Sequence, residues 1–160
     1  NEKYILDQYI MSGGSTLWLL DMVEFATDNL GNPNFAIAMD LNLTDLLFKY
    51  GVRVNSDLVK DLYSAPKLLA NGNERESQYS RYPWFYNPLS NGSAKHPIVT
   101  NIDGVKFEYA SSIDTLPNSI NKTILLNSSP IGSLEMADNE ITTSTFSKVS
   151  IEISLISLWY

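Results

Sequence analysis

Alternating helix-like and strand-like segments in the first third of the chain constrain its fold more than any other feature. Apolar residues within Tyr4–Met11 recur with the spacing of one helix face, and Gly13 or Gly14 supplies a left-handed end to that helix. Leu17–Leu20 follows as an unbroken apolar run. Thr44–Tyr50 repeats the helix pattern and ends at Gly51, with Asn42 or Thr44 as its N-terminal cap. This rhythm is typical of an α/β sheet with helices between its strands.

The strand-like segments predict how such a sheet is layered. Leu17–Leu20 has no polar alternation, which is expected of a central strand covered on both faces by helices. We therefore predict a three-layer, mostly parallel, Rossmann-like sheet. Its later part is β-rich, because Val105–Ala110, Thr123–Leu126 and Val149–Leu158 all have strand-like patterns. Ligands of such sheets lie at the carboxyl ends of the strands, and here that position belongs to Asp21.

Size, charge and composition exclude several classes of protein. The chain has 160 residues, enough for one domain with a core, which we expect to be a soluble domain cut from a longer polypeptide. Its 18 acidic and 11 basic residues give a net charge of −7, which disfavours nucleic acid as a partner. No cysteine is present, so disulfides, thiolate metal sites and a cysteine nucleophile are excluded. The longest apolar runs are too short to span a bilayer.

Three polar residues are candidates for chemistry. Asp21 either binds a cation, a sugar hydroxyl or a partner, or accepts hydrogen bonds from its own loop. His96, the single histidine, is either a general base or a structural residue that ties down a loop before Pro97. Asp103 precedes Gly104 in a predicted turn. With one histidine and no cysteine, we expect neither a metal site nor a cofactor.

An aromatic segment is the second candidate site. Tyr82, Trp84, Phe85 and Tyr86 lie among prolines, which exclude a helix and stiffen the chain. In a strand, Tyr82, Trp84 and Tyr86 would share one face and Phe85 the other. The segment is therefore either a platform for a sugar or peptide or a part of the core.

Several whole phrases lie within residues 6–130: LDQYIMSGGSTLWLLD, DLNLTDLLFKYGVRVNSDLVKDLYSAP, YPWFYNPL, HPIV and ASSIDTL. Through these phrases, and over most of that range, the chain resembles GldG, a component of the gliding-motility-associated ABC transporter. This resemblance implies an auxiliary subunit anchored in the cell inner membrane, with this domain in the periplasm. It also implies the class I glutamine amidotransferase-like fold. Enzymes of that fold use a cysteine, so the resemblance also implies that any ancestral catalysis is lost. The tail, residues 131–160, is less alike, and its role is not predicted.

We therefore expect a non-catalytic binding or assembly module of an ABC-type transport system. Its expected partners are other subunits of the transporter, a sugar or peptide ligand, or a second copy of the chain. One alternative is a carbohydrate-active hydrolase of the same fold that uses Asp21, His96 and Asp103, and it requires two of these side chains to meet in one cleft. Another alternative is a structural spacer without a ligand.

Overall fold

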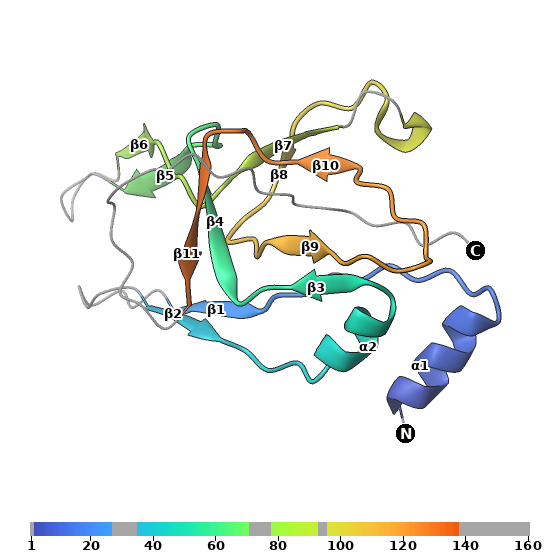
Figure 1. The fold of residues 1–160 in the computed structure, drawn as a ribbon. Helices are drawn as coiled ribbons and strands as arrows, with labels where there is room; N and C mark the ends of the chain where they lie inside the picture. The colour runs from blue at the N-terminus through green and yellow to red at the C-terminus, as the bar shows by residue number, and fades with distance from the viewer. Residues whose placement is uncertain (1, 27–34, 71–77, 93–95, 138–160) are drawn as a thin grey trace.

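The computed structural model describes residues 2–26, 35–70, 78–92 and 96–137. Within these ranges the chain forms two helices, one short 3-10 helix and eleven short strands (Figure 1). In chain order the elements are α1 (Glu2–Met11), β1 (Val23–Ala26), β2 (Phe35–Ala38), α2 (Thr44–Lys49), β3 (Val52–Val54), β4 (Asp57–Asp61), β5 (Lys67–Ala70), β6 (Tyr79–Tyr82), β7 (Leu89–Gly92), η1 (Pro97–Val99), β8 (Val105–Lys106), β9 (Ile113–Thr115), β10 (Leu126–Asn127) and β11 (Gly132–Met136).

The predicted mostly parallel, three-layer Rossmann-like sheet is wrong, and so is the amidotransferase-like fold that the resemblance implied. Every strand pair in the described residues is antiparallel: β1 with β2, β3 with β9, β4 with β11, β5 with β6, and β7 with both β8 and β10. Parallel neighbours require long crossover connections. Here β3 and β4 are separated only by Asn55 and Ser56, and they pair with different partners. An apolar pattern identifies a strand without indicating the direction of its neighbour.

Leu17–Leu20 is not a central strand, which corrects a second prediction. The run lies between α1 and β1 outside any strand, with Leu17 71% and Leu19 81% exposed. Trp18 instead packs inward against the helices. A short apolar run fits a doubly covered strand and an extended connection with one side in the core equally well. Consequently Asp21 does not end a strand; it precedes β1, which begins at Val23.

The two predicted helices are confirmed, and they pack on each other at one end of the molecule (Figure 1). Asp7 of α1 accepts a hydrogen bond from the hydroxyl of Tyr50 at 2.7 Å and pairs with Lys49 at 2.8 Å. Gly13 and Gly51 have the predicted left-handed conformation, with φ of 88° and 79°. The predicted N-terminal cap of α2 is wrong, because the capping position belongs to Leu43 and no side chain bonds there.

The centre of the molecule is β4, which is buried along its whole length. β11 pairs with one of its edges, and on the other edge the Val59 and Asp61 amides donate to the carbonyl groups of Ala110 and Phe85. The strand is nevertheless polar, with the sequence DLVKD. Burial of its charges is possible because each has a partner; Asp57 accepts two bonds from Ser112, from the amide at 2.8 Å and from the hydroxyl at 2.7 Å.

The later part of the chain is β-rich, although its strands are shorter than predicted. Only Val105–Lys106 and Leu126–Asn127 form strands where Val105–Ala110 and Thr123–Leu126 were expected. The start of the tail, as β11, is an integral part of the core through β4. The predicted strand at Val149–Leu158 lies outside the described residues.

Candidate functional site

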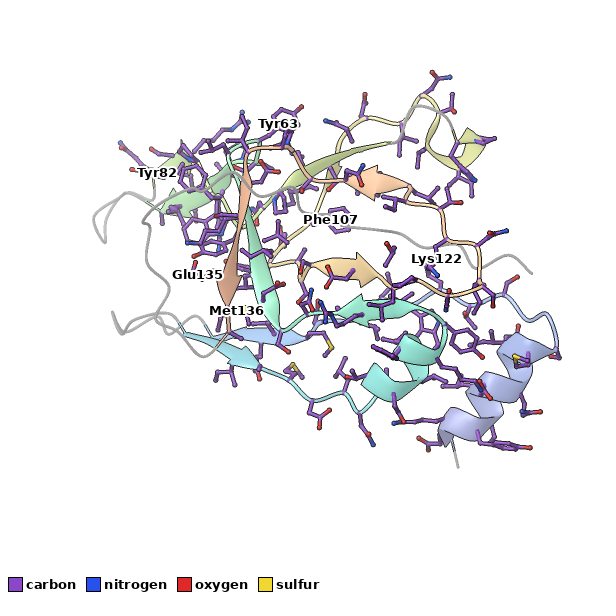
Figure 2. All side chains as sticks on the ribbon, viewed as in Figure 1. Tyr63, Tyr82, Phe107, Lys122, Glu135 and Met136 are labelled. Carbon is purple, nitrogen blue, oxygen red and sulfur yellow. The ribbon has the colours of Figure 1, made fainter. Side chains whose placement is uncertain are left out.

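An apolar groove follows the segment Leu17–Asp21, and we call it the Leu17–Asp21 groove. Its volume is about 300 Å³, at the lower end of the range for ligand pockets. The rest of its lining comes from the two helices, β3 and β9, and from the chain next to these elements. The residues are Ile10, Thr16, Leu47, Tyr50, Val52, Val54, Phe107, Glu108, Ala110, Ser111 and Ile113. Phe107, labelled in Figure 2, is one of these lining residues; it is half-buried and also packs against Val59 and against the cluster of Val99, Leu125 and Leu126.

One residue holds the Leu17–Asp21 segment in place. The ring of Trp18 packs on the cluster formed by Ile10, Leu46 and Tyr50, and its Nε1 donates to Thr16 Oγ1 at 2.9 Å. Because adjacent side chains of an extended chain point to opposite sides, this anchor directs Leu17 and Leu19 outward. The main-chain N–H and C=O groups from Leu17 to Asp21 make no hydrogen bond with any described residue. The segment therefore presents apolar side chains together with backbone groups that have no partner among the described residues.

The polar part of the groove is acidic. Asp21 and Glu108 are its charged members, and none of the described lining residues is basic. The hydrogen bond that Lys106 donates to Glu108 keeps the pKa of that carboxyl below its usual value. Glu108 is thus negatively charged at neutral pH. Such a lining favours cationic groups over anionic ones.

A second candidate region is an aromatic cluster with two lysines. The rings of Trp84 and Tyr86 lie 6.1 Å apart, and those of Tyr86 and Tyr109 stack at 6.2 Å with an interplanar angle of 28°. Lys67 Nζ is 4.8 Å from the centre of the Trp84 ring and donates to the hydroxyl of Tyr109 at 3.0 Å. Trp84 Nε1 is buried and has no hydrogen-bond partner in the part of the chain that the structure describes.

The same cluster continues into a buried ion pair. Lys60 on β4 forms an ion pair with Glu135 on β11, and their side chains are only 10% and 12% exposed. Glu135 is labelled in Figure 2. The hydroxyl of Tyr86 donates to Glu135 Oε2 at 2.6 Å. Burial and the neighbouring Glu135 carboxylate raise the pKa of Tyr86 far above its usual value, so this phenol stays protonated. This arrangement fixes β11 on the core and exposes no nucleophile.

The predicted aromatic site is partly brought together. Trp84 and Tyr86 meet in the cluster just described, Tyr86 is buried, Phe85 is half-buried, and Tyr82 at the end of β6 is exposed. The alternation expected of a strand stops at Tyr82, because the chain turns and the Asn87 amide donates to the carbonyl of Trp84.

Neither of two cavities in the described part of the chain brings together residues of the hydrolase alternative. His96 caps η1, where its Nδ1 accepts from the Ile98 amide at 3.3 Å, so its structure agrees with the structural alternative. Asp21 lies in the Leu17–Asp21 groove, and Asp103 is exposed between η1 and β8. A second, more open cavity of about 490 Å³ lies beside Tyr63 and Asn127. Neither of these two cavities contains two of the three side chains.

The buried charges on β4 were not predicted as a group from the sequence. The available signal was three charged residues inside the strand-like stretch DLVKD, a pattern that predicts partners when the strand is buried. Glu135 was not recognisable, because its contact with Lys60 joins residues 75 positions apart. In the described ranges, no group of three acidic or histidine side chains is arranged to hold a metal ion.

Comparison with known proteins gives the family of the chain. A family model described as "ABC-type uncharacterized transport system" matches residues 1–151. No curated protein and no solved structure matches the chain. Neither helix in the described ranges is long and apolar enough to cross a membrane. The match extends over nearly the whole chain and agrees with the coarser part of the resemblance found in the sequence, so the chain belongs to this family of auxiliary components of ABC-type transport systems.

Proposed function

We propose that this domain is a non-catalytic binding and assembly module of an ABC-type transport system, similar to GldG. The observation that carries this proposal is the Leu17–Asp21 groove, a preformed apolar surface beside a main-chain segment that no described residue pairs with. Soluble proteins rarely leave such surfaces uncovered unless another molecule binds there. Membership of the family supplies the kind of complex in which the partner is found.

The geometry favours binding over catalysis. A hydrolase of the kind considered needs an acid and a base within reach of one substrate atom. Asp21 lines the groove, whereas His96 and Asp103 do not, and His96 uses a ring nitrogen to cap η1. The contact surface that we propose therefore consists of the groove with Asp21 and, as a separate element, the exposed Tyr82.

The finer properties implied by the resemblance are part of the same proposal. They are a membrane anchor outside this chain, a position of the domain in the periplasm at the inner membrane, and a role in gliding where the organism glides. The family match supports them only through membership of an ABC-type transport system.

Affinity purification of the full-length protein from detergent-solubilised membranes tests this function. We expect the nucleotide-binding and membrane-spanning subunits of one ABC transporter to be recovered in constant ratio, as identified by mass spectrometry. An untagged strain processed in parallel is the control. Recovery of the protein without any transporter subunit would refute the proposed function, as would a hydrolytic activity abolished by both Asp21→Ala and His96→Ala in folded proteins.

A further inference from the structure

We propose that the Leu17–Asp21 groove binds an extended peptide segment of a partner polypeptide, one that combines apolar side chains with lysine or arginine. This inference rests on the proposed function and specifies the chemistry of the partner. Three independent features of the groove carry it: its main chain, its apolar surface and its charge.

The main chain of the groove is available for pairing. The N–H and C=O groups of Leu17–Asp21 make no hydrogen bond with any described residue. Proteins satisfy such a row of donors and acceptors by adding an extended peptide alongside it, and the main-chain bonds then supply affinity irrespective of the peptide sequence. A small rigid ligand does not match a row of this kind, whereas a peptide repeats the same spacing.

The apolar surface selects for the side chains of that peptide. Leu17 and Leu19 project outward on either side of the anchored Trp18, beside the wall formed by Val52, Val54 and Ile113. Covering apolar surface contributes about 25 cal/mol per Å² removed from water. An extended peptide places every second side chain on one face, so alternate aliphatic residues fit this surface and the intervening ones stay in water.

The charge of the groove selects a basic partner. Asp21 and Glu108 are acidic, none of the described lining residues is basic, and the chain carries a net charge of −7. Glu108 is already paired with Lys106, so Asp21 is the carboxylate of the groove that has no charged partner among the described residues. Complementary charge accelerates association and suppresses binding of acidic competitors. The same argument disfavours a second copy of this chain, since two copies that meet groove to groove bring these carboxylates together.

Two synthetic peptides test the inference on the isolated chain. One alternates valine with lysine, and the other alternates valine with glutamate, so that apolar content is equal. We expect the lysine peptide to bind in fluorescence polarisation and the glutamate peptide not to bind. Leu19→Ser should weaken binding of the lysine peptide at least tenfold, and Asp21→Asn should weaken it several-fold and reduce its salt dependence.

The matched control is Leu68→Ser on β5, which removes a leucine that is 60% exposed and does not line the groove. It should leave binding unchanged. Equal binding of both peptides, or an equal effect of Leu68→Ser and Leu19→Ser, would overturn the inference. Because this assay needs no transporter, its failure alongside successful co-purification rejects the peptide site and leaves the proposed function standing.

A photocrosslinker identifies the natural occupant in the intact complex. Replacing Leu19 by p-benzoylphenylalanine in the full-length protein should give a crosslink to another polypeptide, within a segment that contains lysine or arginine. A crosslink to a second copy, or to a segment of the same chain, would refute the proposed partner.

Discussion

The buried ion pair between Lys60 and Glu135 should dominate the stability of the core. Lys60→Met retains the length and apolar stem of the side chain and removes its charge. Glu135 then keeps the hydrogen bond from the Tyr86 hydroxyl at 2.6 Å but loses its buried ion-pair partner, while remaining only 12% exposed. Removing one partner of a buried ion pair costs about 3–5 kcal/mol. That is a large part of the roughly 5–15 kcal/mol by which a typical domain is stable.

A double-mutant cycle isolates the interaction of the pair. Glu135→Gln removes the second charge and keeps an acceptor for Tyr86, so Lys60→Met together with Glu135→Gln leaves no buried charge at this position. We expect the loss in the double variant to be smaller than the sum of the two single losses by at least about 2 kcal/mol. The free energy of unfolding is measured by urea denaturation followed by circular dichroism.

An exposed ion pair provides the control for this cycle. Lys3 pairs with Asp45, whose side chain is 73% exposed, so water screens the pair and Lys3→Met should cost far less than Lys60→Met. Additive losses at Lys60 and Glu135, or a loss at Lys60 no larger than that at Lys3, would refute the argument that burial makes this pair important.

Two further predictions concern a glycine and an exposed carboxylate. Gly51→Ala should destabilise the protein by about 1–2 kcal/mol, because φ is 79° and the added Cβ would lie 2.4 Å from Asn118 Nδ2. At Gly13, where φ is 88°, an added Cβ would meet nothing within 4 Å beyond its chain neighbours, so Gly13→Ala should destabilise the protein less than Gly51→Ala. Equal losses of stability in thermal unfolding would contradict the role of the close contact at Gly51. Hydrogen bonds from Arg53, and then Asn55, lower the pKa of Asp114. Ionised Asp114 therefore stabilises the folded protein above the unfolded pKa of about 3.9, and this stabilisation is lost as the pH falls through the lower pKa of the folded state. Because Asp114 is 43% exposed, Asp114→Asn should cost only a few tenths of a kcal/mol at pH 7 and nothing at pH 2; a difference from the native protein that persists unchanged at pH 2 would contradict this.

The sequence predicted those features that depend on local interactions. The positions of α1 and α2 follow from hydrogen bonds and side-chain spacing within a few residues, and their ends follow from the conformational freedom of Gly13 and Gly51. Membership of an ABC-type transport family was also recognisable, because it is carried by phrases of the sequence itself. The acidic, cysteine-free composition likewise limits the chemistry by itself, since it removes thiolate reactions and disfavours anionic partners however the chain folds.

Tertiary structure alone decided which strands pair, and in which direction. The run Leu17–Leu20 satisfies the local criteria for a buried strand, but Trp18 finds its place in the helix cluster and thereby directs Leu17 and Leu19 outward. The polar sequence of β4 is buried because distant residues, Ser112 and Glu135 among them, arrive with matching hydrogen bonds and charge. Whether a segment is buried depends on contacts between residues far apart in the chain, and no local pattern encodes these contacts. The same short apolar or charged run is stable in the interior or at the surface, because its distant partners decide which environment it has.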